Sequence, residues 1–280
     1  MQISCLQTNP QQNFEENVDF ILEQIRVAKK SGANLVVLPE MFTLMGNEAK
    51  RKETKSNIHE GVFAKIKALA KELKLHIIAG SHSEIVDPTV KPWGDNNEKV
   101  YNTSVAYDDK GEILSVYRKL HLFNLKDAQG NKLYCESDTF AEGQTPSTYN
   151  INCNGEVWKA LPIICYDIRF PEIIRNQKEN IDILFVPAAF TWQTGQDHWE
   201  VLLRARAIEN QCYVVACNQT GFHTNNQKRN YGNSMIIDPW GNIVARMGEE
   251  CGILTATISK DKIAESRQKL PALADRRLRL

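Results

Sequence analysis

The stretch LPIICYDIRFPEIIRNQKENIDILFVPAAF, residues 161–190, decides the fold class of this chain. It holds two short apolar runs, at 161–165 and 183–186, and neither run alternates with polar residues. Strands with one face in water alternate, whereas strands covered on both faces are apolar throughout. The runs at 35–38 and 213–217 have the same character. These four runs predict strands inside buried sheets.

Amphipathic helical patterns lie between the predicted strands. Residues 17–31 and 62–74 repeat apolar side chains along one helical face, and we predict further helices over roughly 197–210 and near 260–269. Chains in which strands and helices alternate form α/β folds. Shorter patterns predict the remaining strands at 3–6, 76–79, 100–107, 113–118, 234–238, 243–247 and 252–258.

The helix predicted from about residue 197 begins with a polar pattern. Asp197 and Glu200 have the D-x-x-E spacing of a helix N-cap. Glu200 and Arg204 are four residues apart, the spacing of an ion pair on a helix surface. We therefore predict that Asp197 caps this helix and that Glu200 pairs with Arg204.

The 280 residues carry no excess of either charge. Lysine and arginine together number 34, as do aspartate and glutamate, so the formal net charge is zero. Nucleic acids and anionic membranes attract proteins with a basic excess, and we expect neither as the main partner. No linker divides the chain. We predict a single domain over residues 1–280 with a C-terminal tail at about 270–280.

The cysteines and the first residues predict the compartment. Seven cysteines occur and none forms a CxxC pair, which fits free thiols in a reducing environment. The opening residues MQISCLQTNP lack the pattern of a secretory signal. No window approaches the length of apolar sequence that a membrane helix needs. We therefore expect a cytoplasmic protein.

Motifs for nucleotide, serine-hydrolase and zinc-protease chemistry are absent. The chain has no GxGxxG, no GxxxxGK[ST] and no GxSxG, and no second histidine completes an HExxH motif after His59-Glu60. The sequence therefore gives no sign of these three chemistries.

Three apolar runs each end in a reactive side chain. Residues 35–39 lead to Glu40, residues 113–118 lead to Lys119, and residues 161–164 lead to Cys165. Active sites of α/β proteins form at the carboxyl ends of strands, so these side chains could converge. A neighbouring cation lowers the pKa of a thiol, and a carboxylate can take its proton. A pairing of the thiol with one of the six histidines stays open, although no spacing favours it.

Seven short motifs follow one another along the chain: LPE at 38–40, YRKLHL at 117–122, CYDIRFPE at 165–172, TG at 194–195, HWE at 198–200, RARAIEN at 204–210 and DPWG at 238–241. Together they resemble the nitrilase, or carbon–nitrogen hydrolase, superfamily. The resemblance implies a four-layer αββα sandwich, a homodimer, and Glu40, Lys119 and Cys165 as the catalytic triad. It also implies a second glutamate, Glu136, in the loop after the lysine.

The residue after the cysteine separates groups within this superfamily. True nitrilases have Trp-Glu there, whereas this chain has Tyr166-Asp167, the amidase pattern. The chain most resembles deaminated-glutathione amidases, with omega-amidases acting on α-ketoglutaramate second. Relatives commonly have His where Asn233 stands. Residues 41–57 match neither group well, and we expect that segment to border the substrate pocket.

The resemblance implies hydrolysis of a small linear ω-amide to an acid and ammonia through a cysteine thioester. Cys165 would attack, Glu40 would act as base, and Lys119 with the backbone N–H of Tyr166 would hold the oxyanion. Glu136 would assist the water, and this thioester mechanism needs no metal and no organic cofactor. We further expect Phe190, Thr191 and Thr194, which follow a predicted buried strand, to line the pocket; no Arg or Lys is singled out to bind a substrate carboxylate. An N-carbamoyl amino acid hydrolase and a catalytically silent binding or scaffold protein are the alternatives.

Overall fold

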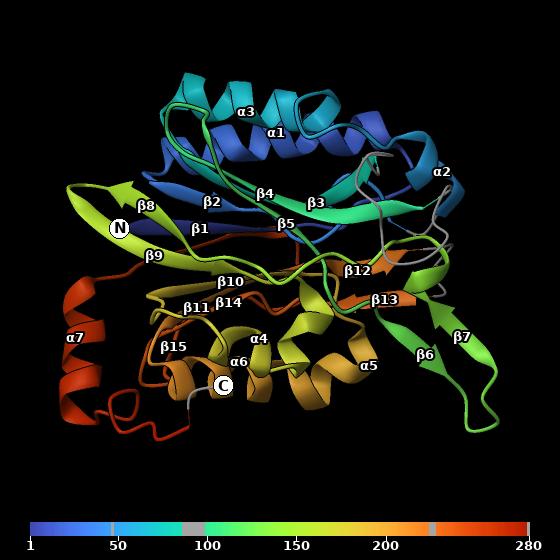
Figure 1. Cartoon of the computed structure of the whole chain (residues 1–280). Coiled ribbons are helices and arrows are strands. Elements are labelled where there is room, and N and C mark those ends of the chain that lie inside the picture. Colours follow the sequence, from blue (N-terminus) through green and yellow to red (C-terminus); the bar gives the residue numbers. More distant parts are fainter. Residues whose placement is uncertain (46–47, 86–98, 224–227, 279–280) are drawn as a thin grey trace.

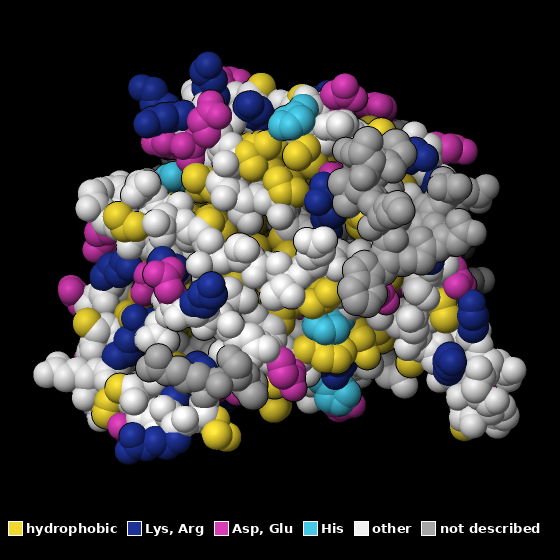
Figure 2. Space-filling view, in the orientation of Figure 1, with side chains coloured by type: hydrophobic (Ala, Val, Ile, Leu, Met, Phe, Trp, Pro, Cys, Tyr) yellow, Lys and Arg dark blue, Asp and Glu magenta, His cyan; other side chains and the backbone are white. Residues whose placement is uncertain are grey.

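The computed structural model describes residues 1–45, 48–85, 99–223 and 228–278. Two six-stranded sheets pack face to face, and helices cover the outer face of each sheet (Figure 1). The result is a four-layer αββα sandwich, which confirms the predicted fold class. Lysine, arginine, aspartate and glutamate are interspersed over the face seen in Figure 2, in keeping with the zero net charge.

The first sheet is parallel at its centre and antiparallel at both sides. β1, β2 and β3 are parallel to one another, while β16 pairs antiparallel with β1, and β4 and β5 continue antiparallel from β3. Because two antiparallel steps restore the direction, β5 runs the same way as β2. In spatial order the strands are β16 (Gly252–Thr257), β1 (Gln2–Gln7), β2 (Leu35–Val37), β3 (His76–Ile85), β4 (Val100–Tyr107) and β5 (Ile113–Arg118).

The second sheet repeats this plan. β9, β10 and β11 are parallel, and antiparallel strands flank them on both sides. β10 and β11 are buried along their whole length, as the unbroken apolar runs predict. In spatial order the strands are β15 (Ile243–Arg246), β14 (Met235–Ile237), β11 (Tyr213–Asn218), β10 (Ile183–Ala188), β9 (Glu156–Pro162) and β8 (Tyr149–Cys153).

The remaining elements are helices and two small hairpins. α1 and α3 cover the first sheet, and α4, α5 and α6 cover the second (Figure 1). The helices are α1 (Phe14–Lys30), α2 (Glu48–Glu53), α3 (Gly61–Leu73), α4 (Glu172–Arg175), α5 (Trp192–Thr194), α6 (Glu200–Asn210) and α7 (Lys260–Lys269), with short turns η1 (Glu136–Asp138), η2 (Cys165–Arg169) and η3 (Gly195–Trp199). The hairpins are β6 (Asn124–Lys126) with β7 (Lys132–Cys135), and β12 (Thr220–His223) with β13 (Lys228–Tyr231).

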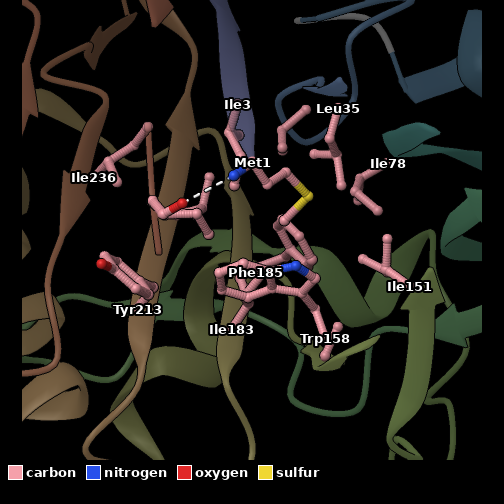
Figure 3. Close-up of a cluster of buried hydrophobic side chains, with 14 of the residues drawn as sticks. Met1, Ile3, Leu35, Ile78, Ile151, Trp158, Ile183, Phe185, Tyr213 and Ile236 are labelled. Atoms are coloured by element: carbon pink, nitrogen blue, oxygen red, sulfur yellow. Dashed lines mark hydrogen bonds between the residues drawn. The ribbon is translucent and has the colours of Figure 1, made fainter. Parts of the chain in front are cut away.

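The layers are held by buried apolar clusters. One cluster lies between the two sheets and draws Leu35 and Ile78 from the first sheet and Trp158 and Phe185 from the second (Figure 3). In the same cluster the terminal amine of Met1 donates to a backbone carbonyl at 2.9 Å. Two further clusters pack the outer helices onto their sheets. Each sheet is therefore covered on both faces, which explains why its central strands lack polar alternation.

Several predicted boundaries differ from the observed ones. The strand predicted at 161–165 ends at Pro162, and Cys165 begins the turn η2. Strand β8 and both hairpins were not predicted, although β8 alternates between buried and exposed residues. None of the helices in the described part of the chain has the length and apolar character needed to cross a membrane.

The helix predicted from residue 197 begins earlier than expected. α5 and the π-helical turn η3 precede α6, so Asp197 lies inside a continuous helical segment. The start of α6 has no side-chain cap, and the prediction that Asp197 caps the helix is wrong. The predicted pair forms: Glu200 and Arg204 lie 3.5 Å apart.

Candidate active site

Two sheets contribute to one group of reactive side chains. Glu40 follows β2 and Lys119 follows β5 in the first sheet, while Cys165 follows β9 in the second. Since β2 and β5 run in the same direction, their carboxyl ends lie at the same end of the sheet, to the right in Figure 1. The side chains therefore meet where the ends of the two sheets face each other.

The ammonium of Lys119 lies at the centre of this group. The residue is only 2% exposed. Its Nζ donates to Glu40 Oε1 at 2.8 Å, and to Glu136 Oε2 at 2.8 Å and Oε1 at 3.0 Å. One ammonium against two carboxylates leaves these three side chains with one net negative charge.

Neutral donors fix the two carboxylates further. Asn102, on β4, donates from Nδ2 to Glu40 Oε1 at 2.9 Å and to Glu136 Oε1 at 3.0 Å. The backbone N–H of Ala189 donates to Glu40 at 2.8 Å, and that of Phe123 donates to Glu136 at 2.8 Å. Hydrogen bonds to an ionised carboxylate stabilise that form. Both carboxylates are thus held in one orientation.

Cys165 sits in a strained turn. Its φ of +48° lies in the left-handed region that residues other than glycine rarely adopt. Such strain collects at functional sites, where surrounding structure maintains it. Burial and the Glu40 charge raise the pKa of the Cys165 thiol well above its ordinary value, and outweigh the Lys119 ammonium, which acts to lower it. The cation acts in the expected direction on this thiol, but burial and the carboxylate outweigh it.

The charges of Glu40 and Lys119 stabilise each other. Burial acts to raise the pKa of the Glu40 carboxyl, but the Lys119 charge and hydrogen bond bring it below its ordinary value. Burial acts to lower the pKa of Lys119, but the charges of Glu136 and Glu40 raise it well above its ordinary value. At neutral pH the site therefore holds a carboxylate base, an ammonium and an uncharged thiol.

Asp167 joins the end of β5 to the turn after β9. Its fully buried carboxylate accepts a hydrogen bond from the Tyr117 hydroxyl at 2.7 Å and from the Ile164 N–H at 3.0 Å. It also accepts from the His121 backbone N–H at 2.9 Å and lies 2.8 Å from the His121 Nδ1. The two segments that carry the ammonium and the thiol are thereby fixed relative to each other.

The predicted pocket residues fall into two pairs. Tyr166 lies in η2 beside the thiol, and the Arg169 guanidinium lies 5.8 Å from its ring and 5.4 Å from the Phe190 ring. Thr191 and Thr194 hydrogen-bond to each other at 2.8 Å around the short helix α5. Among the contacts of the described residues, none links either threonine to the thiol. Tyr166 and Phe190 therefore lie around the same guanidinium, whereas the two threonines form a separate pair.

Histidine rings near the catalytic group contact groups other than the thiol. His121 contacts Asp167, His82 lies 2.8 Å from Thr43, and His198 lies 3.2 Å from Arg169. No group of three or more His, Cys, Asp or Glu side chains among the described residues is arranged to hold a metal ion. The Cys–His alternative has no geometric support there.

Sequence reasoning missed Asn102 and the joining role of Asp167. Asn102 lies in a predicted strand whose other residues are mostly apolar or small, and a buried asparagine there is unusual enough to indicate a polar contact. Asp167 was noted only as part of a motif. Two of its three partner residues, Tyr117 and His121, lie 50 and 46 residues earlier in the chain, and no local pattern reveals these contacts.

Comparisons with known proteins agree on one family. The model of the family described as carbon-nitrogen hydrolase matches residues 2–268. A Synechocystis protein named deaminated glutathione amidase is 40% identical over 275 residues, which cover 98% of this chain and 97% of that protein. A Bacillus subtilis protein named 2-oxoglutaramate amidase is 36% identical over 280 residues, covering 98% and 96%. The crystal structure of Saccharomyces cerevisiae Nit3, described as a member of branch 10 of the nitrilase superfamily, has a TM-score of 0.84, 28% identity, and coverage of 99% and 97%.

Proposed function

This amide-hydrolysing enzyme belongs to the carbon–nitrogen hydrolase family, and we propose that Cys165, Glu40, Lys119 and Glu136 form its catalytic site. One observation carries the proposal: a buried ammonium contacts two carboxylates, and one of them lies close enough to a strained cysteine to raise the pKa of its thiol. Burying this group of charges costs desolvation free energy, and proteins often retain such groups at functional sites.

Acylation begins with a proton transfer. Because the Cys165 thiol is uncharged and Glu40 is ionised, Glu40 takes the thiol proton as sulfur attacks the amide carbonyl carbon. The carbonyl π-electron pair moves to oxygen, and the Lys119 ammonium with the Tyr166 N–H stabilises that oxyanion. When the intermediate collapses, the C–N bond breaks and Glu40 returns the proton to the leaving amine. The acyl group remains on sulfur as a thioester.

Deacylation uses the same base. Water loses a proton to Glu40 and attacks the thioester carbonyl, the C–S bond breaks, and the sulfur regains a proton. Glu136 assists this step indirectly. It accepts hydrogen bonds from Lys119 and Asn102, which also donate to Glu40, and so holds these donors in place.

We propose a 2-oxoglutaryl amide as the substrate, with deaminated glutathione first and 2-oxoglutaramate second. The relatives named for these two compounds support the choice, and the first is the more identical. In both compounds the acyl part of the amide is the same 2-oxoglutaryl group. They differ in the leaving amine, which is ammonia for 2-oxoglutaramate and cysteinylglycine for deaminated glutathione. The sequence analysis expects ammonia as a product. Ammonia is released only from the primary amide, 2-oxoglutaramate.

Release of 2-oxoglutarate from both compounds tests nucleophile and substrate together. We expect a higher kcat/KM for deaminated glutathione, and a loss of at least about 10³-fold in Cys165→Ala because the thioester can no longer form. Cys251→Ala, which changes an exposed cysteine, is the matched control and should retain full activity. Activity within tenfold of wild type in Cys165→Ala contradicts the nucleophile, and no 2-oxoglutarate from either compound contradicts the substrate.

We also propose a homodimer, a single domain and a cytoplasmic location. Val201 and Ile208, seven residues apart on α6, are 67% and 48% exposed, so an apolar strip faces outward there. The cluster between the sheets draws on both halves of the chain, which supports one domain over residues 1–280. All seven cysteines are free, which supports a reducing compartment.

A further inference from the structure

Among the residues that the structure describes, Arg51 is a buried cation without a charged partner. It lies on α2, within the segment 41–57, and is 4% exposed. Its Nη2 contacts the Met45 sulfur at 3.0 Å, and none of the described residues supplies a hydrogen-bond partner for its Nε. Among the side chains that the structure describes, no carboxylate lies within ion-pair distance of Arg51; the buried carboxylates of Glu84 and Glu136 pair with other cations.

Tyr134 places this guanidinium beside the catalytic group. Burial raises the pKa of the Tyr134 hydroxyl to about 12, while Arg51 acts to lower it, Glu136 to raise it and Lys119 to lower it. The hydroxyl is thus within electrostatic reach of Arg51 and of the catalytic charges. α2 and β7, which carry Arg51 and Tyr134, lie at the end of the sandwich where the strands that lead to Glu40 and Lys119 terminate (Figure 1).

An anionic ligand would remove the cost of this arrangement. A buried guanidinium loses its hydration, and only an anion with matching hydrogen-bond geometry compensates it fully. A carboxylate suits the planar guanidinium better than other common groups do. The catalytic group itself has one net negative charge. An anionic substrate therefore needs a separate cation near the site.

We propose that Arg51 binds a carboxylate of the substrate. The proposal rests on the function proposed above and adds the residue that recognises the substrate's charge. Two carboxylates are available: that of the 2-oxoglutaryl group, present in both candidate substrates, and that of the glycine in the leaving dipeptide, present only in deaminated glutathione.

Kinetics of Arg51→Met distinguish these sources. We expect KM to rise about 10- to 100-fold, with kcat within about threefold of wild type, because a charge-assisted contact is lost away from the reacting bond. A rise for both substrates identifies the 2-oxoglutaryl carboxylate, and a rise for deaminated glutathione alone identifies the glycine carboxylate. Lys52→Met removes a charge from the same helix and should leave KM unchanged.

Binding measurements test Arg51 independently of turnover. In Cys165→Ala protein, calorimetry with 2-oxoglutarate and with cysteinylglycine should show one of them bound about 10- to 100-fold more weakly when Arg51→Met is added. The unfolding temperature of unliganded Arg51→Met should equal or exceed that of wild type, because the guanidinium forms no ion pair with the side chains that the structure describes. Unchanged affinity for both compounds overturns the proposal, even if wild-type protein hydrolyses neither substrate; so does a lowered unfolding temperature with unchanged KM.

Discussion

Single residues in the site work only in the presence of their neighbours. Lys119 is buried and charged because two carboxylates contact it, and Glu40 is ionised because Lys119 outweighs the effect of its own burial. The Cys165 thiol stays protonated because burial and the Glu40 charge both oppose a second anion. Removing one charge of such a group leaves the others uncompensated. In typical buried ion pairs this lowers the free energy of unfolding by about 3–5 kcal/mol.

Glu40→Gln should make the Cys165 thiol ionise at lower pH. The substitution removes the negative charge that raises the pKa of the thiol and leaves the Lys119 ammonium that lowers it. Only the thiolate reacts with iodoacetamide, so the alkylation rate rises as the pH passes the pKa. Peptide mass spectrometry of wild-type and Glu40→Gln protein over a pH series measures this shift for Cys165. The exposed Cys251 in the same digest is the control, and an identical profile for Cys165 in both proteins contradicts the electrostatic account.

At the scale of elements, the site depends on how two segments are joined. β5 ends directly before Lys119, and η2 begins at Cys165. The Asp167 carboxylate accepts hydrogen bonds from Tyr117 and His121 on one side and from Ile164 on the other. Because the turn at Cys165 has a positive φ, it needs such external contacts to persist.

Asp167→Asn should lower both stability and kcat. The amide keeps the shape of the carboxylate but loses its charge and one acceptor, which costs about 1.5–3 kcal/mol and about 3–10 °C in unfolding temperature. Displacement of the thiol from the ammonium should reduce kcat about 10- to 100-fold with a smaller effect on KM. Calorimetry and steady-state kinetics measure the two effects. Asp138→Asn, in an exposed pair with Lys132, is the control and should change neither; wild-type kcat in Asp167→Asn would refute its positioning role.

At the scale of the whole molecule, the site exists because two sheets pack against each other. Glu40 and Lys119 come from one sheet and Cys165 from the other, and the apolar cluster between the sheets sets their separation (Figure 3). The outer face of α6 is different, because it presents apolar side chains to the outside. Exposed apolar strips of this kind mark association surfaces.

Val201→Asp combined with Ile208→Asp should convert the proposed dimer to a monomer. Two charges on the exposed strip of α6 would be buried without partners in an isologous interface, which is strongly unfavourable. Light scattering after gel filtration should give twice the chain mass for wild type and one chain mass for the variant. Val157→Asp replaces an exposed valine on β9 and should stay dimeric. A monomeric wild type, or a variant that remains dimeric, would falsify the assignment of this surface.

The sequence by itself determined which strands are buried and which side chains are reactive. Unbroken apolar runs such as 183–186 and 213–217 carry the information that their strands are buried on both faces, because burial on each face excludes polar residues locally. Helical periodicity placed α1, α3 and α7 within a few residues of their observed bounds. The three strand ends singled out Glu40, Lys119 and Cys165 because each follows a recognisable local pattern.

Only the tertiary structure decided the electrostatics and the contacts between distant segments. Asn102 bridges two carboxylates, Asp167 joins two turns, and Arg51 is buried with no ion pair to a described side chain. No local pattern predicts which partners these residues have. The same holds for the pKa of the Cys165 thiol, which is raised because burial and the Glu40 charge outweigh the Lys119 ammonium. The physical reason is that desolvation and Coulomb interactions depend on through-space distance, whereas sequence patterns report on neighbours along the chain.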